Sequence, residues 1–100
     1  MLVTIAGACS ESVDTKMHRF LLKGNESAIR NNHEQAIYYF QEALKLDSCF
    51  ADAWNNLGTL YFDEKDYDKA LDQYTQAIHC RPGFVQAYEN RANTYFILKE

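Results

Sequence analysis

The sequence predicts an all-α protein built from stacked helix-turn-helix repeats, and three observations support this fold class. Two segments repeat at a spacing of 34 residues, so that Gly24 recurs as Gly58 and Phe40 recurs as Tyr74. Apolar residues within each segment follow helical spacing, and a Pro-Gly pair stands at the end of the second segment. A fixed period of this size is typical of architectures in which each unit buries its apolar face only against its neighbours.

The period divides the chain into an N-terminal arm and three units. Residues 1–16 form the arm or linker, and the repeats cover residues 17–50, 51–84 and, as a partial unit, 85–100. Each full unit is expected to hold two helices and the third unit only a first helix. The expected helices are 17–30, 33–46, 51–63, 67–80 and 85–98.

The second unit shows most clearly why each element forms. Its first helix carries one apolar stripe at the spacing i, i+3, i+4 and i+7, which comprises Trp54, Leu57, Gly58 and Tyr61. Its second helix carries a matching stripe of Ala70, Tyr74, Ala77 and Ile78, and a polar turn at residues 63–66 separates the two helices. Pro82 and Gly83 then stop the second helix, because proline lacks an amide hydrogen and glycine tolerates the terminating conformation.

The ordered residues of this unit resemble the tetratricopeptide repeat. The resemblance rests on Trp54-x-x-Leu57-Gly58-x-x-Tyr61, then Ala70-x-x-x-Tyr74, Ala77 and Pro82, and it extends over residues 17–100. It implies a right-handed superhelix whose first helices line a concave groove that binds peptides or partner proteins without doing chemistry. The first unit departs from the pattern, with Lys23, Ser27 and Ser48 at the places of Leu, Tyr and Pro, as is common for an end repeat.

The helix of the third unit lacks the polar outer face that a solubilising end helix presents. It ends in Tyr95-Phe96-Ile97-Leu98, which is apolar nearly all round. We therefore expect one of two arrangements. Either the natural chain continues past Glu100, which we favour, or Tyr95, Phe96 and Ile97 mediate self-association into a homo-oligomer.

Amide side chains are frequent at positions that should face the groove. The candidate peptide-binding residues are Asn25, Asn55, Asn56, Thr59, Asn90 and Asn93 for polar contacts and Phe62 for an apolar one, and the wider set of groove-facing positions adds Leu21, Leu22, Asp63, Gln86 and Glu89. A carboxamide both donates and accepts, so it can pair with an extended backbone of any sequence. The alternative is that these asparagines are merely soluble surface.

Asn56 and Asn90 stand one period apart, and this spacing resembles the asparagine ladder in the superhelix of the O-linked N-acetylglucosamine transferases. In those enzymes the ladder grips peptide backbone; here Leu22 takes the corresponding place in the first unit. The carboxylate clamp of co-chaperones fits less well. Its two asparagines match Asn25 and Asn56, but its basic places hold Leu21, Gln86 and Asn90, which offer a carboxylate no charge-assisted pairing.

Charge and composition exclude several classes of function. The chain carries 10 Lys and Arg against 14 Asp and Glu, a net charge of −4, and has no basic patch. Nucleic acid and anionic membranes are therefore not expected as partners. Residues 51–84 hold six acidic and three basic side chains. This cluster could attract a basic partner, but we favour the interpretation that it solvates a turn and a helix start.

No arrangement of residues predicts catalysis, a cofactor, a metal or a small-molecule substrate. The three histidines are far apart and lack ligand spacing, and the glycines form no phosphate loop. The three cysteines, Cys9, Cys49 and Cys80, are odd in number and lack CxxC spacing, so the sequence predicts neither a disulfide framework nor a zinc site. We therefore expect a protein or peptide partner and no enzyme.

The segment from Ile5 to Ser10 resembles a bacterial lipobox, in which a small residue precedes a cysteine that becomes lipidated. The resemblance implies lipidation at Cys9 and a membrane-anchored protein. Only eight uncharged residues precede Cys9, which is too few for a signal peptide with a basic start. We therefore favour a cytoplasmic location and keep the lipoprotein as the alternative; contact with a membrane is expected only if Cys9 is lipidated.

Overall fold

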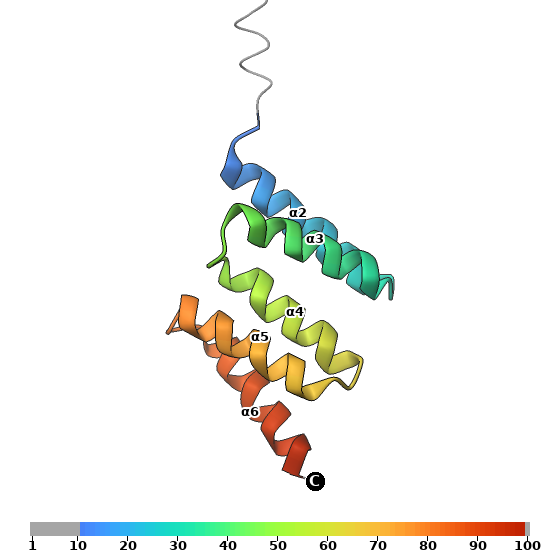
Figure 1. Ribbon diagram of the computed structural model, residues 1–100, viewed down its shortest axis with the longest axis vertical. Helices are drawn as coiled ribbons and strands as arrows, with labels where there is room; N and C mark the ends of the chain where they lie inside the picture. Colours follow the sequence, from blue (N-terminus) through green and yellow to red (C-terminus); the bar gives the residue numbers. More distant parts are fainter. Residues whose placement is uncertain (1–10, 100) are drawn as a thin grey trace, which may run out of the picture.

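The computed structural model describes residues 11–99, and this part of the chain is entirely helical apart from short connections. The helices are α2 (Val13–Ile29), α3 (His33–Leu46), α4 (Ala51–Asp63), α5 (Tyr67–Cys80) and α6 (Val85–Lys99). Figure 1 shows α2 with α3 and α4 with α5 as two hairpins stacked along the long axis, with α6 packed on α5. The all-α repeat fold is confirmed.

The first helix begins four residues before the predicted start. Ser12 caps it, because the Ser12 hydroxyl oxygen accepts a hydrogen bond from the Thr15 amide at 3.1 Å. Arg19 reaches back and donates two hydrogen bonds of 2.9 Å to the Glu11 carboxylate. Residues 13–16, which were expected to belong to the linker, therefore form the first turn of α2.

Two glycines allow the helices of each hairpin to approach closely. A Cβ atom built on Gly24 would lie 2.4 Å from the Phe40 ring, and one on Gly58 would lie 2.5 Å from the Tyr74 ring. Real Cβ atoms do not approach other atoms so closely, so each glycine leaves the space that the facing aromatic ring fills. The same contact thus recurs in both units, one period apart.

The two turns inside the hairpins also repeat with the period. Asn31 and Lys65 adopt left-handed conformations with φ of 63° and 65°. The next residues cap the second helices: Asn32 accepts from the Gln35 amide at 3.2 Å and Asp66 from the Lys69 amide at 3.3 Å. Short polar side chains are favoured at such caps because they satisfy amides that lack a helical partner.

The core lies between helices and joins the hairpins to one another. One cluster of buried residues comprises Met17, Ala43, Phe50 and Ala53, and a second comprises Ala36, Phe40, Leu57 and Leu60. Both clusters draw on the first hairpin and on α4 or the residue just before it, so the units bury apolar surface against each other. Such contacts between neighbours provide the stability of a repeat protein.

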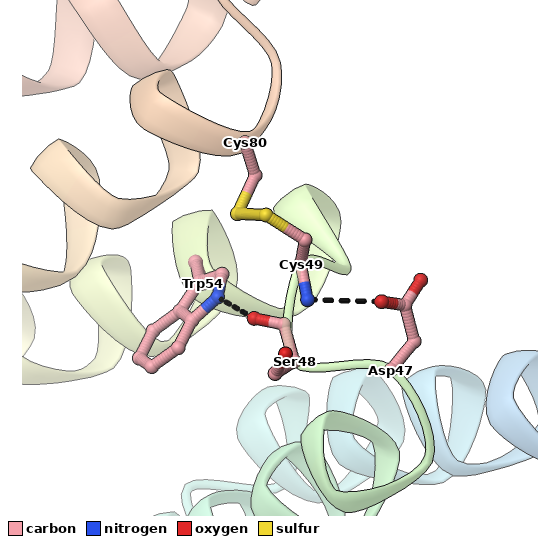
Figure 2. The surroundings of a disulfide bond; sticks show 5 residues. All are labelled: Asp47, Ser48, Cys49, Trp54 and Cys80. Atoms are coloured by element: carbon pink, nitrogen blue, oxygen red, sulfur yellow. Dashed lines mark hydrogen bonds between the residues drawn. A yellow bond between two sulfur atoms is a disulfide. The ribbon is translucent and has the colours of Figure 1, made fainter.

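A disulfide between Cys49 and Cys80 shows that our prediction of no disulfide was wrong (Figure 2). The Cα atoms lie 5.2 Å apart although 31 residues separate them in sequence. Cys49 lies in the loop before α4 and Cys80 ends α5, and the hairpin fold brings these two points together. Neighbouring hydrogen bonds hold the loop, since the Trp54 indole donates to the Ser48 carbonyl at 2.8 Å.

Candidate functional site

A concave groove crosses α2, α4 and α6 on one side of the molecule. It encloses about 390 Å³ and is lined by Asn25, Ala28, Ile29, Phe40, Asn55, Asn56, Thr59, Leu60, Asp63 and Gln86. Four of its lining residues belong to the predicted peptide-binding set, namely Asn25, Asn55, Asn56 and Thr59. First helices therefore supply most of its wall, as the resemblance implies.

Two asparagine pairs tie the first helices of the three units together. Asn56 Nδ2 on α4 donates to Asn25 Oδ1 on α2 at 2.8 Å, and Asn90 Nδ2 on α6 donates to Asn55 Oδ1 on α4 at 3.1 Å. Asn55 is buried, and the other three are half-buried. The sequence predicted one ladder of asparagines at equivalent positions. The structure has two hydrogen-bonded pairs instead, whose members on α4 are the adjacent residues Asn55 and Asn56.

Each pair retains hydrogen-bonding capacity. Asn25 accepts through its oxygen and keeps its amide hydrogens, while Asn56 donates through its nitrogen and keeps its carbonyl oxygen. A peptide backbone presents a donor and an acceptor in every residue. The Asn25–Asn56 pair can therefore meet both groups of an extended chain while remaining bonded to itself.

A polar cluster extends the groove toward the end of α4. Thr59 Oγ1 donates to the Asn55 carbonyl at 3.2 Å and lies 3.3 Å from the Tyr74 hydroxyl oxygen. Burial raises the pKa of the Tyr74 hydroxyl above its ordinary value; the Thr59 hydrogen bond lowers it in part, and the negative charge of Asp63 raises it further. Tyr74 is therefore neutral at physiological pH.

Three of the predicted contact residues lie outside the cavity lining, and one of them, Asn90, reaches it only through its hydrogen bond to Asn55. Phe62 is half-buried and packs edge-to-face on Tyr67, with ring centroids 5.3 Å apart. Asn93 is exposed on α6. The groove instead has apolar lining residues that sequence reasoning missed: Ala28, Ile29, Phe40 and Leu60. The period could have identified Ile29, because it stands one repeat before Asp63.

The end of α6 presents apolar side chains to solvent. Tyr95 is 52% exposed and Phe96 is 63% exposed, while Ile97 is half-buried. Leu98 adds to the same end of the helix at 45% exposed. Tyr95, Phe96 and Ile97 are the residues for which the sequence predicts self-association.

The structure describes residues 11–99, so Cys9, the predicted lipidation site, lies outside the described residues. Within that range, no three His, Cys, Asp or Glu side chains gather in a group that could hold a metal ion. Nor does any helix among those residues combine the length and the apolar character needed to span a membrane.

Comparison with protein families gives two matching models. One, described as tetratricopeptide repeat, matches residues 51–84, and the other, described as TPR repeat, matches residues 24–64. The two matches together extend from the middle of α2 to the end of the second unit.

Comparison with individual proteins finds relatives with the same repeats. Protein O-mannosyl-transferase TMTC3 of Mus musculus is 39% identical over 56 residues, which are 56% of this chain and 6% of that protein. Protein bimA of Emericella nidulans is 32% identical over 72 residues, which are 72% of this chain and 9% of that protein. The probable UDP-N-acetylglucosamine–peptide N-acetylglucosaminyltransferase SPINDLY of Oryza sativa subsp. japonica is 37% identical over 59 residues, 59% of this chain and 6% of that enzyme.

Among solved structures, crystal structures of MamA superpose well on this fold. One has a TM-score of 0.77 at 30% sequence identity and covers 81% of this chain and 47% of that chain. The matched segment is thus about half of MamA and less than a tenth of each curated relative named above.

Proposed function

Because the chain belongs to the tetratricopeptide repeat family, we propose that its concave groove binds an extended peptide or a helix of a partner protein. Tetratricopeptide repeats generally mediate protein–protein interaction and are non-catalytic modules, and the matched segments of this chain consist only of such repeats. The groove as the binding surface, and the residues that make the contacts, are our proposal.

The observation that carries the proposal is the pair of asparagine contacts across the first helices. A bonded amide pair is held in place before a ligand arrives, so binding orders fewer side chains and costs less conformational entropy. Asn25 and Asn56 are only half-buried and line the groove, so their remaining donor and acceptor are accessible. Backbone recognition of this kind suits an extended segment whose side chains vary.

The proposal is tested with peptides selected from a random library on the purified protein. We expect the selected peptides to bind the groove of the wild type and to bind the Asn25→Ala/Asn56→Ala variant about tenfold more weakly. This corresponds to a loss of about 1.4 kcal/mol in binding free energy. Asn93→Ala is the matched control, because it removes an exposed amide outside the cavity lining. Circular dichroism verifies that all variants are folded. Peptides that bind the double variant as tightly as the wild type would show that the asparagines are not the contact surface.

A second candidate function is self-association through the end of α6, favoured by the exposure of Tyr95, Phe96 and Leu98. Sedimentation over a range of concentrations tests it, with Phe96→Glu expected to dissociate any dimer. Tyr38→Glu is the control, since Tyr38 is similarly exposed but lies on α3. A wild type that stays monomeric at high concentration would exclude this function.

A third candidate is a non-catalytic repeat segment within a longer enzyme. Two relatives bear the names of glycosyl-transferring enzymes, and the chain matches only 6% of each. The mass of the protein isolated from its natural source decides the matter. A mass well above 11.6 kDa supports this candidate, and a mass equal to it counts against it.

A further inference from the structure

The concave groove contains a single charged side chain, that of Asp63. The other lining residues are amides, Thr59 and apolar side chains. The two acidic neighbours of Asp63 in the turn have partners: Glu64 lies 3.1 Å from the His33 ring nitrogen and Asp66 lies 3.9 Å from the Lys69 ammonium. Within residues 11–99, Asp63 has no ion pair of its own. A negative charge therefore faces the groove uncompensated.

The position of Asp63 strengthens its negative potential. It is the last residue of α4, where the helix dipole places partial negative charge on the terminal carbonyl groups. It also lies close enough to the Tyr74 hydroxyl to raise the pKa of that group. A carboxylate at a helix C-terminus is electrostatically unfavourable, so a cation from a ligand would stabilise both the side chain and the helix end.

The same groove offers an apolar surface near this charge. Ile29 lines the cavity together with Asp63, and this residue is 86% exposed. Lysine and arginine combine an apolar stem with a charged head, and they bind well where apolar surface adjoins an anion. A short cation such as a metal ion would use the carboxylate but leave Ile29 uncovered. The carboxylate of Asp63 and the apolar surface of Ile29 together thus favour a basic amino-acid side chain as the ligand.

We propose that the groove binds an extended peptide with a lysine or arginine whose stem packs on Ile29 and whose charged head pairs with Asp63. The inference rests on the proposed function, because the asparagine pairs position the peptide backbone and Asp63 then selects the side chain. The acidic excess of residues 51–84, interpreted above as solvation of a turn, favours the approach of such a peptide through long-range attraction.

The test uses three pools of blocked peptides about nine residues long, which is ample to cross the groove in extended form. The pools are randomised except at the central residue, which is lysine, norleucine or glutamate. Norleucine keeps the stem of lysine without its charge. Affinity is measured by fluorescence anisotropy at about 50 mM and about 500 mM salt, since screening weakens a partly exposed ion pair.

We expect the lysine pool to bind about fivefold more tightly than the norleucine pool at low salt, and the glutamate pool to bind most weakly. The advantage of lysine should disappear at high salt and in the Asp63→Asn variant, which keeps the shape of the side chain. Asp72→Asn is the matched control, because it removes the same charge from an exposed site on α5 outside the groove. It should retain the preference for lysine.

Three results would overturn the inference. Equal binding of the lysine and norleucine pools to the wild type refutes the selection by charge but leaves peptide binding in the groove intact. A preference for lysine that survives Asp63→Asn places the cation elsewhere. If none of the three pools binds the wild-type protein, both this inference and the proposed function are wrong.

Discussion

Loss of the Cys49–Cys80 disulfide should remove a large part of the stability of the module. The bond closes a loop across 31 residues, and loop-closure entropy for that length corresponds to about 3.7 kcal/mol at room temperature. A domain of this size typically has a net stability of about 5–10 kcal/mol. Arg81 donates two 3.1 Å hydrogen bonds to Asp52, so the end of α5 keeps one attachment to α4 without the bond. We therefore expect a loss of about 3 kcal/mol.

Urea unfolding followed by circular dichroism measures this loss in a Cys9→Ser background, which prevents thiol exchange with Cys9. The midpoint should fall when a dithiol reductant is added. The Cys49→Ser/Cys80→Ser variant should unfold at the reduced midpoint with or without reductant. Mass spectrometry confirms the oxidised state of the starting protein. Equal midpoints for oxidised and reduced protein would refute the argument, because the closed loop would then contribute no stability.

The same bond bears on the location of the protein. Disulfides form and persist in oxidising compartments and are rare in the cytosol. The Cys49–Cys80 bond therefore counts against the cytoplasmic location that the sequence favours.

Three further predictions concern the core. Gly58→Ala should destabilise the protein by about 1–3 kcal/mol through overlap with the Tyr74 ring, whereas Gly83→Ala, with open space around it, should change urea stability by less than about 0.5 kcal/mol. Trp54→Ala should cost about 2–3 kcal/mol in the same assay, less than a fully buried aromatic, because Trp54 is half-buried. The pKa of Tyr74 is raised in the folded protein above its ordinary value of 10.0, so neutral Tyr74 contributes its full stability at pH values below 10.0. This contribution is lost as the pH rises through the folded-state pKa, and Tyr74→Phe should therefore lose less stability at alkaline pH than the wild type.

The sequence alone determined the helices and their boundaries where local signals were present. Asn32 and Asp66 cap their helices, and Pro82 follows the end of α5, so the predicted ranges of α3 and α5 agree with the structure. The predicted range of α4 agrees as well, although Phe50 before it makes no side-chain cap. The start of α2 was missed because Ser12 precedes the periodic pattern that located the other helices. The period likewise identified Gly24 and Gly58 as equivalent positions, whereas the aromatic ring that faces each of them came from the structure.

Only the tertiary structure decided which side chains meet. Helical spacing places Asn55 and Asn56 on α4 near the groove, but the offset between stacked units determines that one pairs with Asn90 and the other with Asn25. The disulfide depends on the same stacking, since it joins a loop to a helix end 31 residues away. Periodicity fixes the face of a helix on which a residue lies, because 3.6 residues make one turn. It contains no information on the sliding and rotation of one helix against the next, and those displacements set the distances across the groove.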